Sequence, residues 1–407
     1  MNLDDELKRI PASLCIRCKG SKLLCGKSSC PIVTKIYLSR EIPYDLKEVA
    51  GSSPPSVFIG HYGYPKVRIG PAVPPVNEGT EIYERPDMWL NLSIDQIAEM
   101  RFSLYRGYKI LPVARASDPN NYLLELHDLI LSAKPVYTEM EFSKISGRID
   151  ISPESQPFGP GGYVREFYHE NSSSIPSIER LYYDTDVKGA EAVLLLYPGT
   201  SIYSIEKAFS AGMLGKTRSR RIVPTRWSIT AVDKIISDAL LSQIMDFDRI
   251  DGYITFHFRN IGNEYYVLVM PGEYSFEVME IWNNGSIWAG PRRMTVESDY
   301  EKIGKMVSEP KIGGSFFASK VAVLEYLRKR ERKGQIIVVR FIDGEYTIPL
   351  GVWQVRENLR AAMLNGRYID GIDGFFGNIR EKRGIDISGR SKTLQIFKQQ
   401  KMITDYR

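Results

Sequence analysis

The sequence has few cysteines, and it has none after position 30. Only four occur in 407 residues, and all of them lie between positions 15 and 30. A secreted protein stapled by disulfides distributes its cysteines along the chain, whereas a reduced metal-binding protein groups them. The grouping excludes a disulfide scaffold and favours a metal site in a reducing compartment.

The sequence also lacks a long apolar run and an apolar leader. The longest uninterrupted apolar runs, such as residues 192–197, are far too short to cross a bilayer. The first six residues are acidic and lack the apolar core of a secretory signal. We therefore expect a cytoplasmic protein.

No strong charge of one sign is present. The chain has 54 Lys and Arg against 49 Asp and Glu, which gives a formal net charge of +5. This mild excess is compatible with a polyanionic partner but does not require one. Hydrophobic residues at 43% and charged residues at 25% are typical of an ordinary globular protein.

Internal repeats and low-complexity tracts are missing as well. Helical and strand patterns are interleaved without the strict alternation of a doubly wound fold, so we predict an α+β (mixed α/β) class. Ser93 and Gln96 stand at capping-box spacing at the start of one helix. The patterns predict helices over 93–100, 230–245 and 318–332, and strands over 56–59, 265–270 and 335–341.

Composition divides the chain into three parts. Residues 1–34 contain the cysteines, and residues 50–383 look like one globular α+β body without a disordered linker. Residues 384–407 turn polar and basic and end in a few apolar anchors, which predicts a flexible C-terminal tail.

The cysteine cluster predicts one structural zinc ion. A Cys-x2-Cys pair places two thiolates on one side of a tight turn, and a second pair completes a tetrahedron. Four surrounding cations, Arg17, Lys19, Lys22 and Lys27, would favour the thiolate form. An iron–sulfur cluster and four unrelated thiols are the alternatives. The predicted zinc ligands are Cys15, Cys18, Cys25 and Cys30.

A basic segment at residues 216–227 is a candidate for binding phosphate or nucleic acid. Arginine binds phosphate through its bidentate fork, and an indole ring can stack on a base. The alternative is a solvated loop with ordinary surface charge. The candidate residues are Lys216, Arg218, Arg220, Arg221, Arg226 and Trp227.

Two further motifs carry weaker hypotheses. Residues 60–71 are rich in glycine, but their spacing matches neither a Walker A loop nor a dinucleotide fingerprint, so a compact turn between strands is favoured. Asp184 and Asp186 resemble a metal-binding carboxylate pair, although such pairs are more often turns or helix caps. The four histidines are scattered, and no nucleophile motif occurs. No catalytic centre is nominated.

The C-terminus contains a degenerate form of the short peptide that docks on sliding clamps. Gln399, Met402 and Tyr406 have the required spacing, whereas Asp405 stands where a second aromatic residue is expected. In this mode a glutamine is anchored by hydrogen bonds while one 3₁₀ turn inserts an aliphatic and an aromatic side chain into a pocket. A terminal helix packed on the body is the alternative.

Several strings together resemble the archaeal Nre (NreA-type) DNA repair proteins, over nearly the whole chain. The cysteine cluster through Pro31 is one of them, and the others lie at 54–60, 63–67, 133–136, 184–188, 223–233 and 349–357. The resemblance implies a cytoplasmic DNA repair factor that binds the sliding clamp (PCNA) through Gln399, Met402 and Tyr406. It also makes contact with DNA an expectation, and it implies no particular reaction. A binding or adaptor module and an enzyme acting on DNA or a nucleotide, with Asp184 and Asp186 as candidates, both stay open.

Overall fold

The computed structural model describes residues 10–20, 22–27, 30–38, 46–145, 149–152, 155–289 and 294–404, with side chains up to Gln399. The chain forms two compact units, each built from segments that are not contiguous. Unit 1 comprises Met1–Ser28, Ser237–Thr347 and Gln354–Arg407, and unit 2 comprises Ser29–Ile236 and Ile348–Trp353. The predicted mixed α/β class is confirmed, but the sequence predicted one body where the structure has two units.

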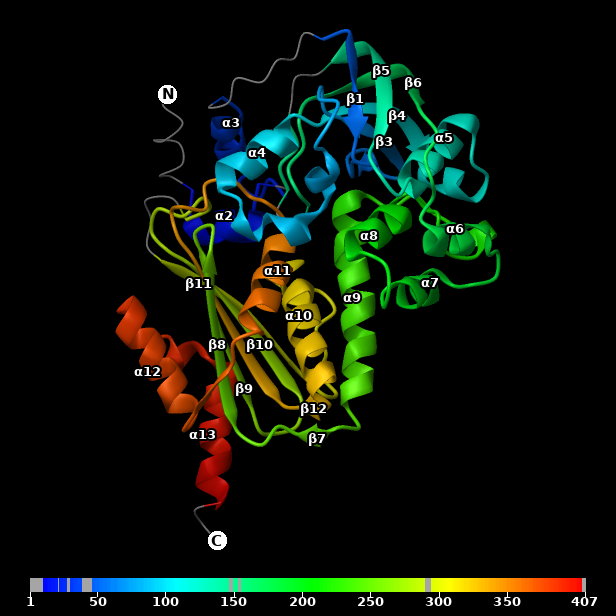
Figure 1. Ribbon diagram of the computed structural model, residues 1–407. Coiled ribbons are helices and arrows are strands. Elements are labelled where there is room, and N and C mark those ends of the chain that lie inside the picture. The colour runs from blue at the N-terminus through cyan, green and yellow to red at the C-terminus, as the bar shows by residue number, and fades with distance from the viewer. Residues whose placement is uncertain are drawn as a thin grey trace. The chain divides into compact units, whose positions relative to one another are not determined.

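Unit 2 is built on a six-stranded sheet with the order β1-β5-β6-β4-β3-β2 (Figure 1). Only the pair β4 and β6 is parallel. Along β3, Val67 and Ile69 are buried while Lys66 and Arg68 are exposed, as expected of a strand with one covered face. The strands are β1 (Glu48–Ser53), β2 (Ser56–Ile59), β3 (Lys66–Val73), β4 (Tyr105–Pro112), β5 (Val136–Ile145) and β6 (Gly161–His169).

Helices α5 (Asn121–Leu131) and α8 (Ile202–Ser210) pack on each other and on β2. Helix α4 (Ile94–Phe102) starts with the predicted capping box: Ser93 Oγ accepts from Gln96 N at 3.2 Å, and Gln96 Oε1 accepts from Ser93 N at 2.9 Å. Such a box typically stabilises a helix by about 1 kcal/mol. The remaining helices of this unit are α3 (Pro31–Leu38), α6 (Pro176–Tyr183) and α7 (Gly189–Leu196), with 3₁₀ turns at Glu81–Glu84, Pro86–Asn91, Val113–Ser117 and Thr217–Ser219.

Unit 1 is built on a second six-stranded sheet with the order β11-β10-β13-β9-β8-β14. Strands β10 and β13 are parallel, and the other pairs are antiparallel. Every residue of β9 and β10 is buried, which is typical of strands covered on both faces. The strands are β8 (Tyr253–Asn260), β9 (Asn263–Met270), β10 (Ser275–Trp282), β11 (Thr295–Lys302), β13 (Gln335–Ile342) and β14 (Arg367–Ile369), beside a small pair of β7 (Asp248–Arg249) and β12 (Arg332–Lys333).

Helices α10 (Ser315–Arg330) and α11 (Trp353–Ala362) lie on one face of this sheet, and α12 (Ile372–Arg383) and α13 (Lys392–Thr404) lie on the other (Figure 1). Phe375, Phe376 and Ile379 of α12 join a core with residues of β9, β10 and β13. A short helix, α2 (Ala12–Cys18), and a 3₁₀ turn, Ser388–Arg390, also belong to unit 1.

Two of the differences from the predicted boundaries have a clear structural cause. Helix α9 spans Thr225–Ile244 and starts five residues before the predicted position 230, because Pro224 O already accepts hydrogen bonds from Trp227 N and Ser228 N at 2.9 Å. The sequence places residues 384–394 in a tail, yet Ile387 and Leu394 are buried in the unit 1 core. Within the described residues, no helix combines the length and apolar character needed to span a membrane.

Candidate nucleic-acid interface

The structure brings together two segments of unit 2, namely the glycine-rich aromatic turn after β2 and the basic segment 216–227. Pro65 O accepts from Val113 N at 2.9 Å, and Val113 O accepts from Ile222 N at 2.9 Å. A third bond runs from Ile59 N to Thr225 Oγ1, also at 2.9 Å. Residues 60–66, which comprise the β2–β3 turn and Lys66 at the start of β3, are therefore joined by hydrogen bonds to the segment 216–227, which is far away in sequence. We call them together the paired loops.

The aromatic side chains of the paired loops meet and stay exposed. The rings of Tyr64 and Trp227 lie 5.2 Å apart between centroids and are tilted by 59°. Tyr64 is 54% exposed and Trp227 is 42% exposed, and Tyr62 on the same turn is exposed as well. Trp227 lies in the first turn of α9, so its backbone is held by the helix.

The segments that contain these rings carry positive charge and no negative charge. Residues 60–71 and 216–227 contain no Asp or Glu, and Lys66, Lys216 and Arg218 are exposed. In the described part of the chain these three side chains have no hydrogen-bond or ion-pair partner. Arg221 is exposed too, and one of its nitrogens donates to the carbonyls of Arg218 and Arg220. The cations are thus available to bind an anionic ligand.

Arg220, one of the predicted nucleic-acid contacts, lies inside unit 2 and not on its surface. Its residue is only 8% exposed, and its guanidinium donates to the carbonyl oxygens of Gly215, Tyr182 and Asp184 at 2.8, 2.7 and 3.0 Å. The guanidinium also lies over the ring of Tyr182. Arg220 therefore holds the segment 215–221 to the unit from inside.

A buried ion cluster fixes the start of β2, the strand that precedes the turn at residues 60–65. Glu84 Oε1 accepts from Ser56 Oγ and Arg101 Nη1, both at 2.6 Å, and Lys207 donates to Pro55 O at 3.0 Å. Burial raises the pKa of the Glu84 carboxyl, but the charges of Arg101 and Lys207 outweigh it and lower the pKa below its usual value. The ionised cluster holds the start of β2, the strand that leads into the turn at residues 60–65.

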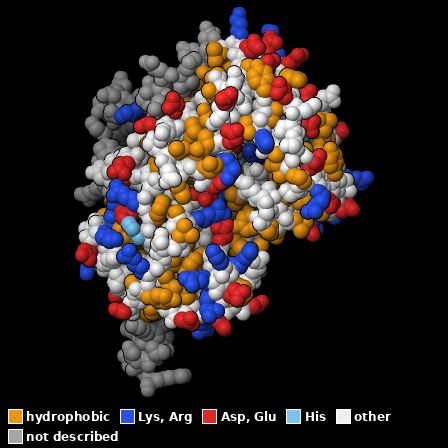
Figure 2. All heavy atoms as spheres, viewed as in Figure 1, with side chains coloured by type: hydrophobic (Ala, Val, Ile, Leu, Met, Phe, Trp, Pro, Cys, Tyr) orange, Lys and Arg blue, Asp and Glu red, His pale blue; other side chains and the backbone are white. Residues whose placement is uncertain are grey.

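The wider surface shows no segregated charge on the face drawn in Figure 2, where Lys and Arg side chains lie among Asp and Glu. The sequence from Lys207 to Val232, by contrast, contains no carboxylate. The positive charge of the segment 216–227 is therefore a local property of this part of the chain, and it does not reflect the small net charge of the whole protein.

The Asp184–Asp186 pair forms a turn. Asp184 Oδ1 accepts from Asp186 N at 2.9 Å and from Val187 N at 3.2 Å, directly after the end of α6. This is an Asx-type turn, the structural alternative that the sequence offered. The glycine-rich segment is likewise the expected turn between two strands, with Gly63 at φ 85°.

Among the described residues, the four cysteines form no disulfide. Cys15 and Cys18 lie in the last turn of α2, where Lys19 N donates to Cys15 O at 2.7 Å, so the predicted tight turn is a helix end. Among the described residues, no three His, Cys, Asp or Glu side chains form a group that could hold a metal ion. The zinc site stays a prediction.

Lys19 does not serve the thiols as the sequence suggested. Its ammonium donates to Glu280 Oε2 and Ile312 O, both at 3.0 Å, inside unit 1. Arg340 Nη1 donates to the other oxygen of Glu280 at 2.7 Å. Burial raises the pKa of the Glu280 carboxyl, whereas the charges of Lys19 and Arg340 lower it, and the net shift is downward. The end of α2 is thereby tied to the unit 1 sheet.

Of the clamp motif, only Gln399 has a described side chain, and it is exposed on α13. Met402 lies in the same helix with its side chain outside the described residues, and Tyr406 lies outside them altogether. The start of α13 is fixed by Glu277, a buried residue of β10. Its carboxylate accepts from Ser391 Oγ at 2.8 Å and from the main-chain N–H groups of Lys392 and Thr393 at 2.7 and 3.0 Å.

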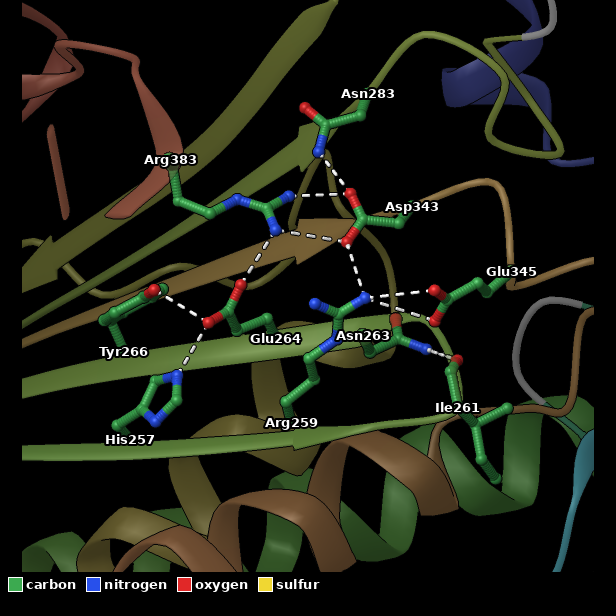
Figure 3. Close-up of polar contacts among 10 residues, drawn as sticks. All are labelled: His257, Arg259, Ile261, Asn263, Glu264, Tyr266, Asn283, Asp343, Glu345 and Arg383. Carbon is green, nitrogen blue, oxygen red and sulfur yellow. Dashed lines mark hydrogen bonds and ion pairs between the residues drawn. The ribbon is translucent and has the colours of Figure 1, made fainter. Parts of the chain in front are cut away.

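A polar network that the sequence did not reveal lies on the α12 face of the unit 1 sheet (Figure 3). Glu264 accepts from His257 Nε2 and Tyr266 Oη, both at 2.7 Å, and from Arg383 Nη1 at 2.9 Å. Arg383 also donates to Asp343 at 2.6 Å. The hairpin register places His257 opposite Tyr266 and sets Glu264 beside them, which sequence spacing alone does not show.

The charge of Glu264 fixes which atom donates in its contact with His257. Burial raises the pKa of the Glu264 carboxyl, but hydrogen bonds from His257 and Tyr266 and the charge of Arg383 hold it at about 2. An ionised carboxylate only accepts, so His257 must donate from Nε2. The His257 side chain is 42% exposed, so solvent reaches the imidazole only in part.

Two family models match the chain. The model described as "Archaeal Nre, N-terminal" matches residues 24–289, and the model "Archaeal Nre, C-terminal" matches residues 301–406. The chain therefore belongs to the archaeal Nre family, which confirms the resemblance seen in the sequence.

The curated relatives agree over most of the length. The chain is 37% identical over 351 residues to "DNA repair protein NreA" of Archaeoglobus fulgidus, covering 86% of this chain and 88% of that protein. It is 35% identical over 359 residues to "DNA repair protein NreB" of the same organism, covering 88% and 89%. It is 33% identical to "DNA repair protein NreA" of Haloferax volcanii, covering 77% of each. No solved structure matches.

Proposed function

We propose that this chain is a DNA repair protein that binds DNA through the paired loops of unit 2 and the sliding clamp through its C-terminal motif. The names of the three relatives and the family membership support the repair role. The observation that carries DNA contact is the set of exposed cations Lys66, Lys216 and Arg218, which have no partner among the described residues and lie in loops without a carboxylate.

Phosphate binding follows from charge and geometry. Each cation that neutralises a phosphate releases condensed counterions, so affinity falls as salt rises. A paired cation would contribute somewhat less, because it would first have to leave its carboxylate, at a cost of up to about 1 kcal/mol for an exposed pair. The three side chains lack such a partner among the described residues, so they bind phosphate without that cost.

The clamp part rests on the location of the motif. Gln399 is exposed on the last helix, where a partner can reach it. The motif spacing from Gln399 to Met402 and Tyr406 is that of a clamp-binding peptide.

The sequence left open whether the protein is an adaptor or an enzyme. The described contacts favour the adaptor, because Asp184 is engaged in its own turn.

Replacing Lys66, Lys216 and Arg218 with alanine tests DNA binding. We expect affinity for a short oligonucleotide to fall, and the slope of log K against log salt to shrink by about 1 for each phosphate that the variant no longer neutralises. Fluorescence anisotropy at a series of salt concentrations measures both quantities.

The matched control removes three exposed cations elsewhere in unit 2, namely Lys134, Lys144 and Arg180. It changes the net charge equally, so an equal loss in this control would show a nonspecific effect of charge. Wild-type protein that binds no DNA would contradict the proposed function.

A further inference from the structure

The exposed ring pair of the paired loops has no role in phosphate binding. Tyr64 and Trp227 contact each other, yet about half of each residue stays in solvent. The other four tryptophans of the chain, Trp89, Trp282, Trp288 and Trp353, are all buried. Trp227 is thus the one indole of five that the fold leaves on the surface.

The backbone holds these rings in place. Tyr64 precedes Pro65, whose carbonyl is bonded to Val113 N, and Trp227 follows Thr225, whose hydroxyl is bonded to Ile59 N. Since α9 continues for 20 residues from Thr225, the indole is attached to a rigid element. A ligand that contacts the rings meets a surface formed in advance, and less ordering entropy is lost on binding.

Exposed aromatic rings beside phosphate-binding cations favour single-stranded over double-stranded nucleic acid. In a duplex the base faces are stacked on one another, so an aromatic side chain reaches them only when a base is unpaired or extruded. In single strands every base offers a face, and aromatic side chains beside a positive groove are the usual means of binding it. Cations alone would serve a duplex equally well.

We propose that Tyr64 and Trp227 form a stacking site for unpaired bases, so that the paired loops bind single-stranded DNA in preference to duplex. The inference rests on the proposed function, since it names the form of DNA that the same loops take. Lys66, Lys216 and Arg218 hold the phosphates, and the two rings hold the bases.

Binding of a labelled single-stranded oligonucleotide and of its duplex tests the inference by anisotropy. Wild-type protein binds the single strand more tightly. The double variant Tyr64→Ala, Trp227→Ala weakens single-strand binding by about 10- to 100-fold and leaves duplex affinity and its salt slope unchanged. The ring-retaining variant Tyr64→Phe, Trp227→Phe stays within about threefold of wild type, because phenyl rings also stack.

Intrinsic fluorescence gives a second readout. Adding an unlabelled single strand quenches part of the tryptophan emission, and Trp227→Phe abolishes that quenching while the buried indoles keep their signal. Circular dichroism of each variant confirms that the loss is not unfolding.

The outcomes separate the two proposals. Absence of DNA binding by wild type overturns the proposed function. Equal binding of both forms, without quenching, overturns the stacking site alone. Tighter binding of an RNA of the same sequence overturns its assignment to DNA.

Discussion

Glu264 carries three hydrogen bonds on two oxygens and is only 8% exposed. Its donors come from β8, β9 and the last residue of α12, so one carboxylate joins a hairpin to a helix. Removing one partner from such a buried ionic network typically costs about 3 kcal/mol or more, because the remaining charges are left without compensation. Stability of unit 1 should therefore depend on this single side chain.

The variant Glu264→Gln tests this dependence. We expect the free energy of unfolding at pH 7 to fall by about 3 kcal/mol, measured by urea denaturation. The folded pKa of about 2 lies below the ordinary value of 4.5, so the contribution is complete above pH 4.5. It is lost as the pH falls from 4.5 toward 2, and the variant should lack that part of the acid dependence.

Glu345→Gln is the matched control in the same network. The Glu345 side chain is exposed and pairs with the exposed Arg259, so its loss should cost less than about 1 kcal/mol. Equal destabilisation by the two variants, or an unchanged acid profile in Glu264→Gln, would contradict the assignment.

The sequence shows where the charged residues are, but it does not show which of them are exposed and which are buried. Arg218 and Arg220 are two positions apart in one basic run, yet the first is exposed and the second binds three carbonyls. His257 and Glu264 are seven positions apart, a spacing that indicates nothing until the hairpin turn at Ile261 and Gly262 is known. Tertiary contacts decide these roles.

At the scale of elements, the sequence predicted a helix or strand correctly where residues close in sequence supply its hydrogen-bond partners or its apolar pattern. The capping box at Ser93 and the apolar runs of β9 and β13 predicted their elements correctly. The start of α9 was missed because Pro224, which cannot donate, provides the first acceptor, and Thr225 bonds to another strand. Sequence offered helix α13 only as the alternative to a flexible tail, because Glu277, which caps it, is distant in sequence.

Deletion of residues 399–407 tests the role of the last helix. We expect clamp binding to be lost, because Gln399, Met402 and Tyr406 are removed together. The fold should survive, since Leu394 and the bonds from Ser391, Lys392 and Thr393 to Glu277 are retained. Biolayer interferometry with the sliding clamp and thermal melting measure the two effects.

Lys398→Ala is the control for this deletion, since Lys398 is exposed beside the motif and does not belong to it. Clamp affinity that survives the deletion would show that the motif was misread.

At the scale of the molecule, the division into two units had no signal in composition. The boundary at Ile236 and Ser237 falls inside α9, so no linker rich in proline, glycine or polar residues marks it. The two family models meet between residues 289 and 301, inside unit 1. Sequence predicted the fold class and missed how segments distant in sequence share a sheet.

Metal content is a property of the whole protein and tests the cysteine hypothesis. We expect one zinc per chain by elemental analysis of freshly purified protein, and little iron, because four grouped thiols form a closed tetrahedral site. Replacing Cys15 and Cys18 with serine should remove the metal, while replacing Ser28 with alanine should not. Zinc near zero, or stoichiometric iron, would reject zinc as the resident metal.

The bonds from Glu277 to the start of α13 have a consequence for avidity. A helix rises about 1.5 Å per residue, so Gln399 lies about 12 Å along the axis from Ser391. A partner that binds this motif is tethered to unit 1 by a short, stiff spacer instead of a random coil. The spacer restricts the volume that the partner explores around unit 1. It therefore raises the effective concentration for any second contact between the partner and unit 1.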